Sequence, residues 1–207
     1  MLMDGRSGRT RSPDLQAEKP KYDEGYHFVT IVTNKRVEVF KHQDIARMAI
    51  DTILFYEKRG DFKVKGFIVM PDHVHMICEC SHPASGSDRS PGLFANTHPG
   101  SGRSPDLPSI IRNIKKYIAK EAIQCLSVLD KTMLSHIQLP KPKKRKHTYQ
   151  LWQPDYYDFN ILTERKLNEK LKYMYENPIR KGLCDSPFDY EFSDIKRYFG
   201  SGDPKLP

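Results

Sequence analysis

The sequence has no long hydrophobic run, and none of its apolar stretches approaches the ~18 residues of a membrane-spanning helix. Its first residues, MLMDGRSGRTRSPDL, lack the apolar core of a secretory signal peptide. Cysteine is also scarce. Of the four cysteines, Cys78 and Cys80 share one face of a predicted strand and cannot easily bridge each other. These absences argue against a disulfide scaffold and predict a cytoplasmic protein with no membrane partner.

Positive charge is unevenly distributed along the chain. The net charge is +8, and residues 108–150 hold ten basic and two acidic residues, which accounts for the whole excess. A localised basic block is typical of proteins that bind polyanions such as nucleic acids, although a solvated loop can have the same composition. The basic residues that we take as candidates for DNA contacts are Arg112, Lys115, Lys116, Lys120, Lys141, Lys143, Lys144, Arg145 and Lys146.

Two segments have the composition of disordered chain. Residues 1–22 and 81–108 are rich in Gly, Ser, Pro and Arg, and both carry the sequence Arg-Ser-Pro-Asp-Leu. We therefore expect a disordered N-terminal segment followed by one domain at residues 23–200. The segment 81–108 is then a low-complexity insertion in this domain, 141–147 is a basic loop, and 201–207 form a tail.

Hydrophobic periodicity between these segments alternates between the two-residue period of strands and the 3.6-residue period of helices. The expected elements are a strand at 26–33, a helix at 44–59 capped by Asp44, strands at 62–70 and 73–80, a helix from Ser109 to about Leu126, a short strand at 149–153, and a helix from the cap Thr163 to about Glu176. This order predicts an α+β fold: a ferredoxin-like antiparallel sheet with helices on one face.

The sharpest local motif is a histidine pair in the third expected strand. His73 and His75 are two residues apart, so their side chains point to the same face of the strand, opposite to Val74 and Met76. Two imidazoles in this arrangement can hold one divalent cation. Two half-exposed histidines on an edge strand would give the same pattern, so both interpretations stay open at this point.

A tyrosine motif lies on the last expected helix. Tyr173 and Asn177 are four residues apart and share a helix face, whereas Tyr175 points in roughly the opposite direction. A tyrosine beside a metal can act as a nucleophile, and an amide oxygen can act as a further ligand. An aromatic residue that packs against the sheet, followed by an asparagine helix cap, is the structural alternative.

Taken together, these motifs resemble the HUH single-strand endonucleases. The stretch Met70-Pro71-Asp72-His73-Val74-His75 is similar to their histidine–hydrophobe–histidine motif. The stretches Leu151-Trp152-Gln153, Tyr156-Tyr157-Asp158 and Tyr173-x-x-x-Asn177-Pro178 resemble the single-tyrosine transposases, and among these the REP-associated tyrosine transposases of bacteria. The resemblance covers roughly residues 25–80 and 109–185.

The resemblance implies an enzyme that cleaves and rejoins single-stranded DNA, at repeats that form hairpins, with Mg²⁺ or Mn²⁺. Tyr173 would attack the phosphodiester and stay linked to the 5′ phosphate, with His73 and His75 as metal ligands. Asn177 occupies the place where related insertion-sequence transposases have a glutamine ligand, and its side chain is one methylene shorter. The motifs leave monomer and homodimer both open.

Other functions fit parts of the same sequence. A catalytically inactive member of the family would grip hairpin DNA through the basic block without cutting it. Replication initiators and relaxases of the HUH class often carry a larger histidine cluster and extra domains, which this chain lacks. An RNA-binding ferredoxin-like domain would present aromatic residues on its central strands, where this sequence places His73 and His75. The transposase is therefore the favoured prediction.

Overall fold

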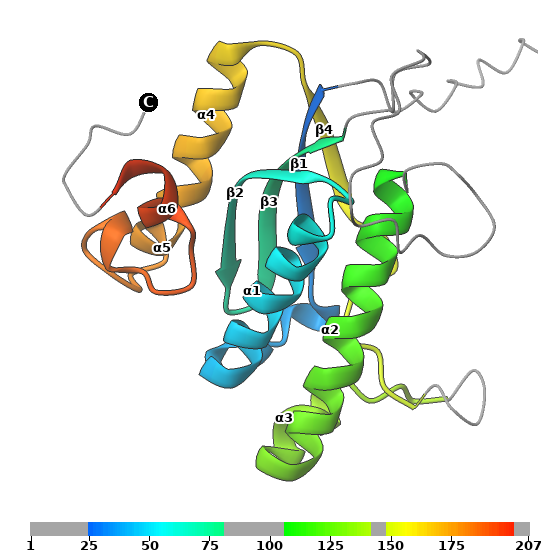
Figure 1. Ribbon diagram of the computed structural model, residues 1–207. Helices are drawn as coiled ribbons and strands as arrows, with labels where there is room; N and C mark the ends of the chain where they lie inside the picture. Colours follow the sequence, from blue (N-terminus) through cyan, green and yellow to red (C-terminus); the bar gives the residue numbers. More distant parts are fainter. Residues whose placement is uncertain (1–24, 81–105, 142–147, 201–207) are drawn as a thin grey trace, which may run out of the picture.

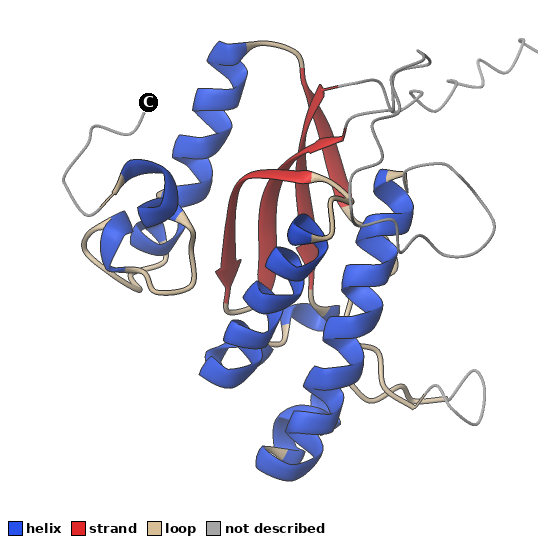
Figure 2. Ribbon diagram, viewed as in Figure 1, coloured by secondary structure: helices blue, strands red, loops and turns tan. Residues whose placement is uncertain are grey.

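The computed structural model describes residues 25–80, 106–141 and 148–200. Its centre is one four-stranded antiparallel sheet with the strand order β2-β3-β1-β4 (Figures 1 and 2). The predicted α+β class with an antiparallel sheet is therefore confirmed. The strands are β1 (Gly25–Val32), β2 (Lys63–Met70), β3 (His73–Cys80) and β4 (Tyr157–Ile161).

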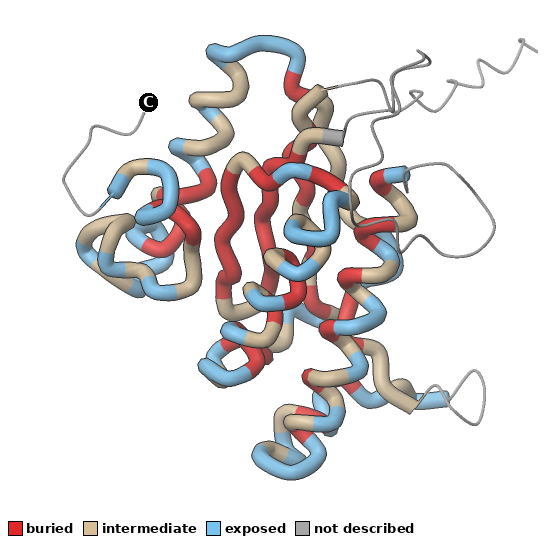
Figure 3. Tube along the Cα trace, viewed as in Figure 1, coloured by how far each residue is buried: buried red, intermediate tan, exposed pale blue. Residues whose placement is uncertain are grey.

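Two long helices cover one face of the sheet. They are α1 (Gln43–Lys58) and α2 (Leu107–Leu129), which lie side by side in front of the strands in Figure 1. Their apolar stripes pack onto alternate residues of the strands and form the larger of two hydrophobic clusters, which includes Val29, Met76 and Ile114. The strands and the inner sides of these helices are the most buried parts of the chain (Figure 3).

The opposite face of the sheet carries a second, shorter helical layer, where the prediction had helices on one face. This layer consists of α4 (Glu164–Tyr175), α5 (Asn177–Arg180) and α6 (Ile195–Phe199). Met174 and Tyr175 pack there against the intervening strand residues, such as Phe28 and Ile77. The second layer forms because these strands are apolar on both faces, which leaves a second surface to be covered. Shorter elements are η1 (Asn34–Arg36), η2 (Val39–Lys41), α3 (Lys131–His136) and η3 (Pro187–Asp189).

Several predicted boundaries and caps differ from the structure. The helix α1 is preceded by His42, and Asp44 lies inside its first turn. The side chain of Asp106 caps α2 by accepting a hydrogen bond from the Ser109 amide (3.0 Å). Ser109, the predicted cap, therefore lies inside the first turn and donates the capping hydrogen bond. The predicted cap Thr163 does begin α4, because its side chain accepts from the Lys166 amide.

The fourth strand lies later in the sequence than predicted. Residues 149–153 form only isolated bridges, such as Thr33 to Trp152, and the regular strand begins at Tyr157. This strand includes Tyr157 and Asp158 of the Tyr156-Tyr157-Asp158 motif and pairs with β1 over five residues. Residues 1–22, most of the 81–108 insertion and of the 141–147 loop, and the tail at 201–207 lie outside the described residues. The described part of the insertion consists of Asp106, which caps α2, and the first two residues of that helix, which begins at Leu107.

No helix in the described part of the chain is long and apolar enough to cross a lipid bilayer.

Candidate active site

The histidine pair lies on β3, an interior strand with β2 on one side and β1 on the other. His73 and His75 point to the face of the sheet that α4 covers, while Val74 and Met76 belong to the opposite core, as the alternation predicted. Only 7% of His73 and 5% of His75 is exposed to solvent. The alternative of half-exposed histidines on an edge strand is therefore wrong.

Both imidazoles are held by their Nδ1 atoms. His73 Nδ1 lies 2.5 Å from a carboxylate oxygen of Asp72, and His75 Nδ1 lies 2.8 Å from the hydroxyl oxygen of Thr30. Arg36 in turn donates to the other carboxylate oxygen of Asp72 at 2.9 Å. These contacts aim the two Nε2 atoms at each other, 3.1 Å apart. A carboxylate or hydroxyl behind each imidazole is the arrangement that orients metal-binding histidines.

Burial keeps the pair uncharged at neutral pH. It lowers the pKa of His75 to about 3, with a further contribution from the repulsion that a protonated His73 would exert. Burial also lowers the pKa of His73, against the opposing hydrogen bond to Asp72. Burial alone would raise the pKa of Asp72, but hydrogen bonds from His73 and Arg36 hold that pKa below its ordinary value. Neutral imidazoles can present the nitrogen lone pairs that a metal requires.

Tyr173 lies across from the histidines, on the last turn of α4. Its ring centre is 5.8 Å from that of His75 and 6.1 Å from that of Phe28, and 45% of the residue is exposed. Tyr175 points the other way, as the helical spacing predicted, and is buried with its hydroxyl donating to Asp194 at 2.9 Å. The two tyrosines therefore differ in access to solvent although they are two residues apart.

Asn177 begins the short helix α5 and does not continue α4, because Glu176 ends α4. Its side chain still reaches the same cleft as Tyr173 and is 8% exposed. Among the described residues the buried amide nitrogen has no hydrogen-bond partner, and the amide oxygen lies 3.5 Å from Arg180. A buried polar group with unused bonding capacity is unusual, and such groups are found where a ligand completes the site.

One cleft of about 650 Å³ collects these groups, so the structure brings together all four residues predicted as nucleophile or metal ligands. Three cationic side chains and no carboxylate are among the residues that line it. Sequence analysis did not single out these cations, because Lys170 and Lys181 resemble ordinary residues of a solvated helix face. The lining residues are Phe28, Thr30, Val32, Arg36, His73, His75, Tyr157, Lys170, Tyr173, Asn177 and Lys181.

Two cationic side chains also frame the tyrosine directly. The guanidinium of Arg180 lies 4.6 Å from the Tyr173 ring centre and donates to the Tyr173 carbonyl oxygen. The ammonium of Lys170 lies 5.8 Å from the same ring. A positive surround of this kind suits a polyanionic substrate that approaches the tyrosine.

The basic residues of α2 lie away from this cleft, and three of them, Arg112, Lys115 and Lys116, line a shallow groove of about 430 Å³ beside residues 149–154. Arg112 and Lys116 are exposed there, but Lys115 donates to the carbonyl oxygens of residues 153–155 at 3.0–3.3 Å. Lys120 lies outside the groove lining and pairs with Glu121 at 2.9 Å. Lys141 is exposed, and Lys143, Lys144, Arg145 and Lys146 lie outside the described residues.

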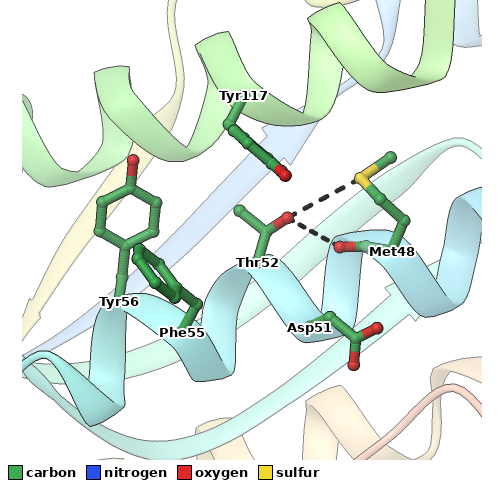
Figure 4. A pocket seen from close by; sticks show the side chains of 6 residues that line it. All are labelled: Met48, Asp51, Thr52, Phe55, Tyr56 and Tyr117. Atoms are coloured by element: carbon green, nitrogen blue, oxygen red, sulfur yellow. Dashed lines mark hydrogen bonds between the residues drawn. The ribbon is translucent and has the colours of Figure 1, made fainter. Parts of the chain in front are cut away.

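A third pocket of about 350 Å³ lies between α1 and α2, on the face of the sheet opposite the histidines (Figure 4). It is lined by Met48, Asp51, Thr52, Phe55, Tyr56 and Tyr117. The Thr52 hydroxyl is already used, because it donates to the Met48 carbonyl at 2.7 Å. With no histidine, cysteine or cation among these lining residues, the pocket lacks the groups for phosphate chemistry.

The chain is similar to a relative in sequence and to two solved structures. The chain is 24% identical over 166 residues to an uncharacterized protein of Haemophilus influenzae, with 75% of this chain and 81% of that protein covered. A solved structure described as a REP-associated tyrosine transposase bound to a REP hairpin has a TM-score of 0.55 and 19% identity, covering 98% of this chain and 94% of that one. A putative transposase from Deinococcus radiodurans has a TM-score of 0.42 and 15% identity, covering 82% of this chain and 95% of that one.

The family model that matches is described as "Transposase IS200 like" and covers residues 21–88. This stretch contains β1, α1, β2 and β3, and with them His73 and His75. It ends before Tyr173, so the tyrosine helix rests on its own geometry. Residues 21–88 are thus similar to the IS200-like transposases, and this similarity confirms the resemblance that the sequence motifs indicated.

Proposed function

We propose that this protein is a metal-dependent transposase that cleaves and rejoins single-stranded DNA through Tyr173. The observation that carries the proposal is the cleft itself. There the Nε2 atoms of His73 and His75 and an exposed tyrosine meet, although they come from β3 and from α4 at the far end of the chain. A nucleophile beside a cation site in a positively charged cleft is the constellation that phosphoryl transfer requires.

The two imidazoles fit a divalent cation. Two ligands of an octahedral ion at a right angle, each about 2.1 Å from the ion, lie about 3.0 Å apart, close to the 3.1 Å between the Nε2 atoms. No group of three His, Cys, Asp or Glu side chains that could hold an ion was found in the described residues, so Asn177 is our candidate for a third protein ligand. Because Mg²⁺ and Mn²⁺ both favour oxygen ligands, water and substrate phosphate oxygens would complete the coordination beside the two imidazoles.

A bound Mg²⁺ or Mn²⁺ would polarise the scissile phosphate and favour the phenolate form of a nearby tyrosine. The Tyr173 oxygen then forms a bond to phosphorus and gives up its proton, the bond to the 3′ oxygen breaks, and that oxygen takes a proton to become a hydroxyl. The DNA 5′ phosphate stays on Tyr173 as a phosphodiester. Attack by another 3′ hydroxyl reverses the exchange and rejoins DNA without an external energy source.

We also propose that the DNA substrate contains a hairpin, because the REP-associated transposase of similar fold was solved with a REP hairpin. The groove along α2 and the loop after it would hold phosphates outside the cleft through Arg112, Lys116, Lys120, Lys141, Lys143, Lys144, Arg145 and Lys146. The role of Lys115 is different, because its ammonium is engaged by backbone carbonyls.

The test is a cleavage assay on single-stranded oligonucleotides taken from the flanks of the protein's own gene, with Mn²⁺ or with EDTA. We expect a covalent protein–DNA adduct with Mn²⁺ that is lost in EDTA, in Tyr173→Phe, and in His73→Ala or His75→Ala. Tyr56→Phe, on the opposite face of the sheet, is the matched control and should form the adduct. Tyr175→Phe is a poor control, because it removes the hydrogen bond to Asp194.

Two outcomes would change the proposal. An adduct that persists in Tyr173→Phe and maps by mass spectrometry to Tyr157, which lines the same cleft, would move the nucleophile to β4. Tight hairpin binding with no adduct under any metal would favour the alternative of an inactive DNA-binding protein from the same family.

A further inference from the structure

An exposed aromatic residue stands at the rim of the candidate active site without a packing role. Tyr157 is the first residue of β4 and lines the cleft, yet 53% of it is exposed. It pairs across the sheet with Thr30, whose hydroxyl contacts His75. The ring therefore lies one strand away from the predicted metal ligands, and about half of the residue is open to solvent.

Phe159 follows Tyr157 by two residues in β4, so its side chain lies on the same face of the sheet. The ammonium of Lys170 lies 4.7 Å from the Phe159 ring centre and 4.8 Å from that of Phe28. Among the described residues no carboxylate forms a salt bridge with Lys170, whereas Arg36, another of the three cations that line the cleft, pairs with Asp72. The rings of Phe28 and Phe159 thus contact a positive charge that has no salt-bridge partner among the described residues, in the cleft that also holds Tyr173.

We infer that Tyr157 and Lys170 form a subsite for the unpaired nucleotide that adjoins the scissile phosphate, in which Tyr157 stacks on the base and Lys170 contacts a phosphate. This inference deepens the proposed function and rests on it. Aromatic side chains beside a basic groove are the common device for holding single strands, because every base has a face to stack. A base within a duplex is stacked on both faces, so this subsite would admit only unpaired DNA.

A role for Tyr157 as nucleophile fits the geometry less well. Tyr173 has a direct ring contact with His75, and no such contact joins Tyr157 to either histidine. Stacking needs the ring and not the hydroxyl, so Tyr157→Phe separates the two roles. The phenylalanine variant should cleave and bind like the wild type if the ring stacks, and should lose the adduct if the hydroxyl attacks.

The decisive measurement is whether the effect of the Tyr157→Ala change on binding affinity depends on the presence of one particular base in the DNA. Oligonucleotides with one abasic position, moved through the nucleotides on both sides of the cleavage site, are titrated by fluorescence anisotropy in EDTA, so that binding is separated from cleavage. Tyr157→Ala should weaken binding of the intact strand roughly five- to 150-fold, the range for losing one stacked base. At one flanking position, base removal should weaken the wild type by a similar factor and leave Tyr157→Ala unaffected.

Controls come from residues of matched exposure elsewhere in the chain. Phe55 is 58% exposed on the opposite face (Figure 4), and Phe55→Ala should keep the full effect of base removal. Lys170→Gln should flatten the log–log dependence of affinity on salt by about 0.7 for one lost phosphate contact. Lys172→Gln, on the same helix but outside the cleft lining, should leave that slope unchanged. Circular dichroism of each variant verifies folding, and Tyr157→Leu provides a second variant that keeps bulk without an aromatic face.

The outcomes separate this subsite from the proposed function. If Tyr157→Ala and Tyr157→Leu bind every oligonucleotide like the wild type while the wild type forms its adduct, the subsite is refuted and the transposase proposal stands. If the abasic coupling is present but no adduct forms with any metal, the subsite stands and the catalytic proposal falls. Equal effects of base removal in wild type and Tyr157→Ala at all positions would also refute the subsite.

Discussion

Asp194 provides a test of the packing that holds α4 on the sheet. It is 6% exposed, and one carboxylate oxygen accepts hydrogen bonds from the Phe67 amide (2.7 Å) and the Tyr175 hydroxyl (2.9 Å). The other oxygen is buried without a partner in the described structure. Burial raises the pKa of Asp194 to about 6, against these hydrogen bonds, which favour the charged form. The fold therefore favours the protonated carboxyl.

The sign and size of the effect follow from this shift. A carboxyl with a raised pKa contributes stability that is complete below its unfolded value near 3.8 and is lost as pH rises through about 6. The difference of roughly two pKa units corresponds to about 3 kcal/mol at most. Asp194→Asn keeps an oxygen for the Phe67 amide and carries no charge at any pH. Relative to the wild type, the variant should gain up to about 3 kcal/mol of unfolding free energy between pH 4 and pH 8.

Urea unfolding of both proteins at half-unit steps of pH, in EDTA, measures this difference. The comparison is needed because His75, whose pKa is lowered, acts in the opposite direction: its contribution is present above about pH 6.5 and is lost as pH falls toward 3. Both proteins contain His75, so its contribution cancels in the difference. If the difference in unfolding free energy between the two proteins does not vary with pH, the raised pKa of the buried Asp194 carboxyl is refuted.

Two further predictions concern close packing and the basic helix. Gly66→Ala would place a methyl group 2.8 Å from atoms of Met174 and Tyr175. We therefore expect urea unfolding to show a loss of about 1–3 kcal/mol in unfolding free energy. A loss below about 0.5 kcal/mol would show that α4 packs less closely on the sheet. Lys115→Gln should lower the unfolding free energy by about 1–2 kcal/mol through the lost carbonyl contacts. Lys116→Gln should leave stability unchanged and weaken DNA binding, and the reverse pattern would show that the two lysines were assigned wrongly.

The sequence was informative where function depends on local periodicity. The alternation around His73 and His75 predicted a shared face, because a strand fixes side-chain direction with a period of two. The spacing of Tyr173 and Tyr175 likewise predicted opposite directions on a helix, and the structure confirms both. These features needed no knowledge of which elements pack together.

Features that depend on tertiary contacts were missed. The β4 strand at Tyr157–Ile161 follows a proline and mixes polar with aromatic residues, and its strand character comes from pairing with β1. The sequence does not distinguish Lys170 from other helical lysines, because its position in the cleft depends on the packing of α4 against Phe28 and Phe159. Asp194 is similar, since only the approach of Phe67 and Tyr175 buries its carboxylate. The sequence pattern within a single helix or strand cannot predict these contacts, because each of them joins two different elements.

Tyr173 and Tyr175 lie two residues apart on α4 and have different environments, which fit different roles. The Tyr175 hydroxyl is committed to Asp194, and its ring is buried, so it fixes the end of α4 against the sheet. In the described part of the chain no group forms a hydrogen bond with the Tyr173 hydroxyl, and its ring is flanked by Arg180 and Lys170. In-line attack demands a nucleophile in a fixed position with a free oxygen. Tyr175 holds the end of α4 in place, and Tyr173 is the proposed nucleophile with a free oxygen. If the proposed function is correct, loss of the Tyr175 hydroxyl should slow cleavage without removing the nucleophile.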